Sequence, residues 1–384
     1  MTFIFDQVMD RSHTDSAKWE LYGPDVLPLW IADMDFATAP VITEALHQRI
    51  SHGIYGYTQP GKDLEQLIVD RCRERYQWEI QAEWIVWLPN LVSALHIATR
   101  AYTTSDESVI APVPVYHHFL IAPKNADREL VQLNWTDRDG VPVLDLEELD
   151  ARLARQESKE PRLLLLCNPH NPNGRVLSQA ELQELEQFCQ KHNLIICSDE
   201  IHCDLILDKE VRHTPFASLS DFAREHTVTL MSASKTFNLA GFASAYAIIP
   251  NAELRARFQQ VRDGIVPPPD MLGFIAAKAA YSEGGDWHEA LLEYLRGNHD
   301  YLLQAINAIP GLTMKPLQGT YLAWIDTSAL GLDDPQAFFL EAGVGLNAGA
   351  VFGDKDYVRL NFACPRSVLE EAVGRMAAAI AARG

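Results

Sequence analysis

Lys235 is the residue whose position in the sequence most clearly permits covalent chemistry. It follows a run of β-type residues, Thr227–Met231, and the small residues Ser232–Ser234 lie directly before it. A lysine held at a strand end among small residues can form a Schiff base, because its neighbours leave room for a bound carbonyl compound. Partial burial lowers the pKa of such an amine and makes it nucleophilic. Most lysines are solvated surface charges, so the pattern alone also fits an ordinary lysine.

Two upstream segments strengthen the chemical interpretation. Asn168–Gly174 follows the apolar run Arg162–Cys167, and Asp199–His202 follows the apolar run Leu194–Ser198. Apolar runs that alternate with helical patterns indicate a mostly parallel α/β sheet, in which ligands bind at the carboxyl ends of the strands. The two segments and Lys235 are therefore expected at one edge of a sheet.

In this order, the three segments resemble the fold-type I pyridoxal-phosphate (PLP) enzymes of the aminotransferase superfamily. The resemblance implies an α/β fold whose large domain, residues 46–285, has a mostly parallel sheet of the seven-stranded type between helices. Residues 1–45 and 286–384 are expected to form an N-terminal arm and a smaller α+β domain.

Hydrophobic periodicity predicts helices in both parts of the chain. Helices are predicted over residues 41–50, 63–76, 92–102, 179–192, 287–309 and 365–382. Ser178 and Glu181 have the spacing of a capping box at the start of the fourth helix. Strand character is expected around Gln318–Thr320.

PLP requires an amine for its aldehyde, an acid beside its pyridine nitrogen, and hydrogen bonds to O3′ and the phosphate. The resemblance assigns Lys235 to the aldehyde and then to removal of the substrate Cα proton. It assigns Asp199 to the pyridine nitrogen, where a carboxylate favours the protonated ring. A strand-end aspartate that caps a helix is the alternative. Asn171 and His202 resemble the residues that bond O3′.

The phosphate-binding residues depart most from the family pattern. The resemblance places backbone amides of a helix start beside the phosphate, at Asn90 and Leu91. The family often has Gly-Ser or Gly-Thr there, so only main-chain donors are expected from Leu91. Ser232 matches a serine three positions before the lysine, whereas Ala243 replaces an arginine that many aminotransferases carry. Tyr57, reaching in from a partner subunit, is the candidate for an added donor.

Three more residues are expected to meet the ring or the substrate. Tyr116 resembles the aromatic residue that stacks on the ring, and an ordinary core tyrosine is the alternative. Arg359 lies on an apolar strand, where a buried arginine needs an anionic partner. The resemblance makes this partner the substrate α-carboxylate, gripped by two hydrogen bonds, and an internal ion pair is the alternative. Ala32 lies where the family's backbone approaches the substrate.

Several segments resemble the MalY/PatB group of C–S β-lyases more closely than a general aminotransferase. They are Lys18–Glu20, Leu27–Phe36 with Ala39 and Pro40, His52–Thr58, Cys167–Arg175, Ser198–His202 and Ser234–Gly241. The resemblance covers essentially the whole chain. It implies α,β-elimination from L-cystathionine or related cysteine S-conjugates to a thiol, pyruvate and ammonia. An amino-acid aminotransferase with the same residues and a PLP-fold regulatory or binding protein are the alternatives; the physiological substrate and leaving group are left open.

Composition narrows the possible partners. The chain has 32 basic and 52 acidic residues, so its net charge of −20 argues against binding to nucleic acid or an anionic membrane. Six scattered cysteines without a C-x-x-C pair favour reduced thiols in a cytoplasmic protein, and no metal site is expected. The first residues lack the features of a signal peptide, and no apolar run is long enough to span a bilayer. A homodimer with shared active sites is expected from the assignment of Tyr57.

Overall fold

A computed structural model describes residues 3–383. Its central element is an eight-stranded sheet with the order β2-β9-β8-β7-β6-β3-β4-β5. The strands are Ile85–Leu88 (β2), Glu107–Val113 (β3), Glu129–Arg138 (β4), Val141–Leu144 (β5), Glu160–Cys167 (β6), Ile195–Asp199 (β7), Thr227–Met231 (β8) and Ala245–Ile248 (β9). Neighbours from β8 to β4 are parallel, whereas β2, β9 and β5 join antiparallel. The prediction of a mostly parallel α/β sheet is confirmed, and the short β5 adds an eighth strand.

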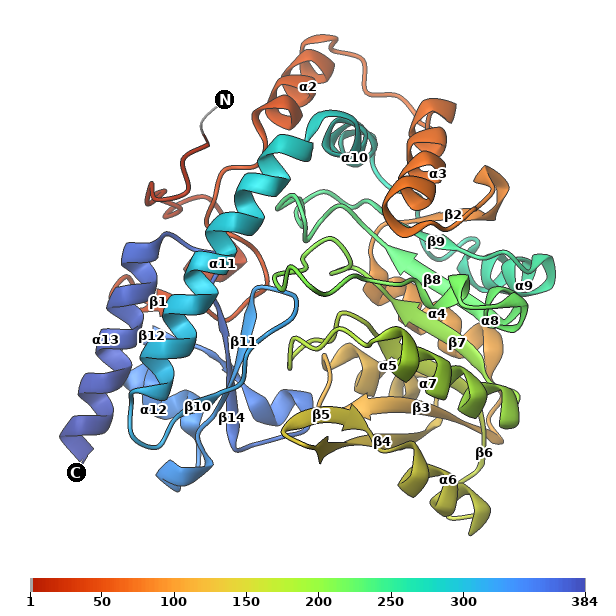
Figure 1. Ribbon diagram of the computed structural model, residues 1–384. Helices are drawn as coiled ribbons and strands as arrows, with labels where there is room; N and C mark the ends of the chain where they lie inside the picture. The colour runs from red at the N-terminus through yellow and green to blue at the C-terminus, as the bar shows by residue number, and fades with distance from the viewer. Residues whose placement is uncertain (1–2, 384) are drawn as a thin grey trace.

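Helices cover both faces of this sheet (Figure 1). One face carries Leu91–Tyr102 (α4), His118–Asn125 (α5) and Ala252–Arg262 (α9), and the other carries Leu146–Ala154 (α6), Gln179–Lys191 (α7) and Asp221–His226 (α8). Alternate residues of β6 serve the two faces: Leu163 and Leu165 pack under α4, and Leu164 and Leu166 pack under α7. Burial on both sides explains why these strands read as continuous apolar runs.

The C-terminal part of the chain builds a smaller antiparallel sheet, in the order β10-β11-β14-β13. Its strands are Thr313–Met314 (β10), Leu322–Asp326 (β11), Asn347–Ala348 (β13) and Tyr357–Asn361 (β14). Around it lie the helices Gly285–Asn307 (α11), Pro335–Glu341 (α12) and Arg366–Arg383 (α13). The strand Leu27–Pro28 (β1) of the N-terminal arm pairs in parallel with Val344–Gly345 (β12).

Most of the predicted elements are confirmed, and one is wrong. The six predicted helices are present to within two residues at each end, including Pro40–Ser51 (α2) and Lys62–Tyr76 (α3), and the capping box of α7 is formed. Gln318–Thr320, expected as a strand, is a bend before β11 in which only Gly319 forms an antiparallel β-bridge, with Ile206. Its backbone groups bond to the loop that follows β7, because Leu207 N–H donates to Gln318 O and Thr320 N–H to Leu205 O.

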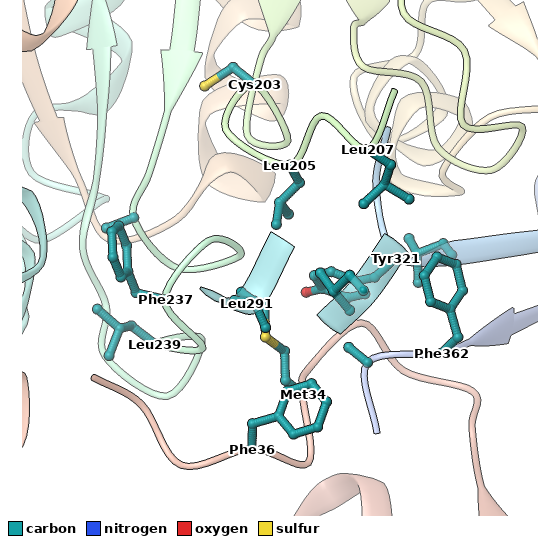
Figure 2. Close-up of a cluster of buried hydrophobic side chains, with 14 of the residues drawn as sticks. Met34, Phe36, Cys203, Leu205, Leu207, Phe237, Leu239, Leu291, Tyr321 and Phe362 are labelled. Atoms are coloured by element: carbon teal, nitrogen blue, oxygen red, sulfur yellow. The ribbon is translucent and has the colours of Figure 1, made fainter. Parts of the chain in front are cut away.

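The N-terminal arm is packed into the centre of the molecule. Figure 2 shows Met34 and Phe36 of the arm in one buried cluster with Phe237 and Leu239, which follow Lys235 in the chain. This cluster fixes the arm against the loop that carries the lysine.

No helix within residues 3–383 meets the length and apolarity that a membrane span requires. Besides those already named, the helices are Ala17–Glu20 (α1) and Met271–Glu283 (α10).

Candidate active site

The carboxyl ends of β6, β7 and β8 lie side by side. Cys167 pairs with Asp199, and Asp199 pairs with Leu230, in the register of the three strands. Just beyond these ends is a cavity of about 300 Å³. It is lined by all the predicted site residues except Tyr57: Ala32, Asn90, Leu91, Tyr116, Asn171, Asp199, His202, Ser232, Lys235 and Arg359. The expectation that the three segments meet at one sheet edge is thus confirmed.

Lys235 lies in the loop after β8, where its amine reaches the N-terminal arm. Its Nζ donates a hydrogen bond to the carbonyl oxygen of Ala32 at 2.6 Å. The pKa of this amine is lowered to about 8: burial is the main cause and Arg359 adds to it, whereas Asp33 and Asp199 oppose the shift. A substantial fraction of the amine is therefore uncharged near neutral pH and able to act as a nucleophile or base.

Asp199 ends β7 with a buried side chain that is 6% exposed. Its Oδ1 accepts a hydrogen bond from Ile201 N–H at 3.1 Å, within a turn and not at a helix start. Burial raises the pKa of this carboxyl to about 7, and the Ile201 N–H opposes the rise. A positively charged hydrogen-bond donor beside this buried carboxyl would stabilise its ionised form.

His202 and Asn171 present hydrogen-bonding groups that have no partner among the described residues. His202 is 3% exposed, and its buried Nδ1 has no partner among residues 3–383. Burial lowers the pKa of this imidazole to about 3, so the ring is neutral. The side-chain oxygen of Asn171 accepts a bond from Arg359 at 3.0 Å, which turns the amide NH₂ away from that partner. Buried polar atoms without partners are costly unless a ligand satisfies them.

Arg359 brings a buried cation from β14 into the cavity. It is 3% exposed, and its Nη1 and Nη2 donate to Asn171 Oδ1 and to the carbonyl oxygen of Trp30. Its buried Nε has no partner, and within residues 3–383 no carboxylate oxygen forms an ion pair with it. Burial lowers its pKa to about 10. The internal ion pair that the sequence left open is absent from the described chain, so the guanidinium is available to an anionic ligand.

The start of α4 forms another wall of the cavity. Asn90 caps this helix, because its side-chain oxygen accepts a hydrogen bond from Ser93 N–H at 2.8 Å. The first-turn N–H groups of a helix attract anions. Ser232 is less available than the sequence suggests, since its hydroxyl donates to Ser244 O at 2.7 Å and accepts from Ser234 N–H at 3.0 Å. Tyr57 is fully exposed and does not line the cavity of its own chain.

Asn238 and Asn361 position the arm, and sequence reasoning missed both. Asn238 accepts from Met34 N–H at 2.9 Å and donates to Met34 O and Phe36 O. Its φ of +55° is a conformation that asparagine tolerates, which is the one signal that the sequence carried. Asn361 donates from β14 to Ile31 O at 2.7 Å and to Asp33 O at 2.6 Å. Together they hold the carbonyl of the residue between, Ala32, against the lysine.

Comparison with known proteins agrees with this arrangement. The family model described as aminotransferase class I and II matches residues 24–376. The chain belongs to this family. It is 36% identical to cystathionine beta-lyase PatB of Bacillus subtilis (strain 168), over 98% of this chain and 99% of PatB. The predicted resemblance to the aminotransferase superfamily and to the MalY/PatB group is confirmed.

Solved structures of similar proteins have the same fold throughout. The crystal structure of OvoB superimposes with a TM-score of 0.95 at 47% identity, covering 98% of this chain and 99% of that chain. Cystalysin from Treponema denticola, whose structure contains a pyridoxal 5′-phosphate cofactor, has a TM-score of 0.95 at 32% identity, with both chains fully covered. The fold is therefore that of PLP fold type I enzymes, as expected.

Proposed function

We propose that this member of the family is a PLP-dependent C–S β-lyase. It cleaves L-cystathionine or a related cysteine S-conjugate to a thiol, pyruvate and ammonia. The observation that carries the proposal is the pairing, in one cavity, of an amine of lowered pKa, Lys235, with a buried guanidinium that lacks a counter-anion, Arg359. The name of PatB and the PLP content of cystalysin support the reaction and the cofactor.

The polar groups of the cavity fit PLP. Lys235 would hold the aldehyde, Asp199 the pyridine nitrogen, and the Nδ1 of His202 and the amide of Asn171 would meet O3′. The helix start at Leu91 would receive the phosphate, and the ring of Tyr116 would lie against the cofactor ring. When bound, PLP supplies an electron-withdrawing ring that acidifies the substrate Cα–H.

The chain's own residues then perform binding and proton transfer. Arg359 binds the substrate α-carboxylate through its unpartnered guanidinium nitrogen, and its bonds to Asn171 and Trp30 keep the group in a fixed orientation. Lys235, as a neutral amine, removes the Cα proton, and the carbonyl of Ala32 holds its nitrogen in place. The thiolate departs from Cβ, and hydrolysis of the released enamine yields pyruvate and ammonia.

Product identity tests the proposal. PLP-loaded protein and L-cystathionine are incubated without any keto acid, and pyruvate and free thiol are measured. We expect the two products in equal amounts. If pyruvate is absent, and a new amino acid forms only after a keto acid is added, the protein is an aminotransferase and the proposal is wrong.

The pH dependence of PLP capture follows from the pKa of Lys235, which burial lowers from 10.5 to about 8. Only the neutral amine attacks an aldehyde, so the capture rate of cofactor-free protein should rise about tenfold per pH unit below pH 8 and level off above it. Stopped-flow absorbance measures this rate, with Nα-acetyl-lysine as the control amine. A protein rate that keeps rising in parallel with the control above pH 9 would contradict the lowered pKa.

We also propose a homodimer in which Tyr57 completes the partner's site. The segment around it exposes apolar side chains, since Ile54 and Tyr55 are 66% and 61% exposed and Tyr57 is fully exposed. In a mixture of Tyr57→Ala and Lys235→Ala proteins, each heterodimer contains one complete site, so activity should recover to roughly a quarter of the original. Full activity of monomers at high dilution would refute the proposal.

The division of the chain remains a proposal of the same kind. Residues 46–285 would form the large domain, and residues 1–45 with 286–384 the smaller one; the separate sheets and the start of α11 at Gly285 support it. Limited proteolysis that cuts first within the eight-stranded sheet would contradict this division.

A cytoplasmic location is proposed because all six cysteines are buried and reduced. Recovery of the protein in a secreted fraction would contradict that location.

A further inference from the structure

The segment Asp199–Ile206 separates two cavities. Asp199 and His202 line the active site, whereas Cys203, Asp204 and Ile206 line a second cavity of about 600 Å³, which we call the rear cavity. Figure 2 shows Cys203 on this segment, above Leu205 of the central buried cluster. The rear cavity is completed by the end of α3, the loop Asp208–Leu219 and one turn of α11. None of its residues takes part in the proposed reaction.

Cations outnumber carboxylates around the rear cavity. The groups on its wall or paired with it are Arg71, Arg75, Lys209, Arg212 and Arg296, against Asp204, Asp208, Glu293 and Glu200. This excess is notable in a chain whose net charge is −20. It creates a locally positive potential that attracts anions.

The buried carboxylate of this cavity is already fully engaged. Asp204 is 5% exposed, binds Arg71, and accepts a bond from Tyr76 at 2.5 Å and an ion pair from Arg75 at 3.3 Å. These partners hold the pKa of Asp204 well below its usual range. In contrast, the exposed Arg212 makes no hydrogen bond or ion pair with any residue from 3 to 383. One cation on the wall is therefore free to bind a ligand.

His213 adds a buried group without a full set of partners. Its side chain is 1% exposed, and its Nε2 lies 2.7 Å from the carboxylate of Glu200. Glu200 also accepts bonds from Ser198 and from Phe216 N–H, so its carboxylate is held in place beside the ring of His213. The buried Nδ1 of His213 has no partner within the described residues. This nitrogen is therefore a hydrogen-bonding group beside the rear cavity that no described residue satisfies.

Part of the remaining wall is apolar, with Ile206, Val211, Leu219 and Leu292 contributing hydrocarbon surface, and Gln77, Gln179, Thr214 and Ser218 add polar side chains. A site with a few cations and an apolar patch suits a ligand with an anionic head and a small apolar body. We propose that the rear cavity binds a small organic anion of this kind, with Arg212 meeting its head group. The head can be a phosphate or a carboxylate, since both accept the fork of hydrogen bonds that an arginine offers.

Calorimetric titration of PLP-loaded protein tests the proposal. The probes are phenyl phosphate and benzoate, and benzamide is the neutral control. We expect saturable binding of at least one anion, and comparison of the two identifies the preferred head group. Arg212→Gln should weaken this binding at least about tenfold, because it removes a charged hydrogen-bonding partner. Arg212→Lys should lose less affinity because it keeps the charge.

Two further variants locate the bound probe. Arg155→Gln replaces an arginine whose side chain is 57% exposed and paired only with Glu157, and it should leave affinity unchanged. Arg359→Lys should also leave it unchanged, because that residue belongs to the active site. The proposal is overturned if neither anion binds, if benzamide binds equally well, if Arg212→Gln has no effect, or if Arg359→Lys abolishes binding. Binding is read directly, so these outcomes do not depend on whether the protein is a lyase.

Discussion

Replacement of Lys235 by alanine is expected to lower kcat for pyruvate release from L-cystathionine by at least about 10³-fold. The change removes the amine that would hold the cofactor and take the Cα proton. The described residues offer no substitute. The other titratable groups that line the cavity are a buried carboxyl, histidines whose pKa burial lowers, a tyrosine and the Cys167 thiol whose pKa burial raises, and an arginine. The assay is steady-state pyruvate production by protein saturated with PLP.

A matched control and a rescue experiment separate chemistry from folding. Lys191→Ala removes a lysine that is 61% exposed on α7 and pairs with Asp150, and it should retain full activity. Small primary amines added to Lys235→Ala protein should restore part of the rate, because they can enter the space left by the side chain and accept the proton. Loss of less than tenfold in the variant would remove Lys235 from its assigned role.

The location of the site was predictable because it depends on sheet geometry. In a parallel sheet every strand ends at the same edge, so residues that follow β6, β7 and β8 must meet there wherever they lie in the sequence. Asn171, Asp199 and Lys235 were found in this way. Helix ends were predicted closely for a similar reason, since periodicity and caps such as Ser178 are local signals.

Contacts between distant segments could not be predicted from local patterns. Asn238 binds Met34 across 204 positions of sequence, and Arg359 binds the carbonyl of Trp30 across 329. The antiparallel direction of β9 is likewise invisible in the apolar run Ala245–Ile248, because apolar character reports burial and not strand direction. The segment Gln318–Thr320 makes a single β-bridge and not a strand, because its partner is the loop after β7, which the sequence could not identify.

The lack of a counter-anion at Arg359 shows what the structure adds to the resemblance. The sequence predicted that a buried arginine requires an anion but could not exclude a carboxylate from elsewhere in the chain. The structure surrounds the guanidinium with Asn171, the carbonyl of Trp30 and the ring of Phe352 at 4.7 Å, none of which carries a negative charge. This is the basis for proposing that the substrate supplies the anion.

Asp199→Asn is expected to lower kcat at least about 10²-fold while PLP stays bound. The substitution keeps the size of the side chain and its bond to Ile201 N–H, but a neutral amide cannot stabilise a proton on the pyridine nitrogen. In the wild-type protein burial raises the pKa of Asp199 to about 7, and a cation beside it favours the ionised form. Without that charge pair the ring withdraws electrons less strongly, so removal of the Cα proton slows.

Three measurements distinguish this electronic effect from a loss of structure or of cofactor. The PLP content and the thermal unfolding midpoint of Asp199→Asn should stay near those of the wild-type protein, whereas its kcat falls. Exchange of the substrate Cα proton with deuterated solvent should slow in parallel with kcat, because Asp199 acts on that step. Asp221→Asn, at a side chain that is 91% exposed, should change none of these. If Asp199→Asn loses its PLP but keeps its rate per bound cofactor, the residue serves to hold the cofactor and does not tune its electron demand.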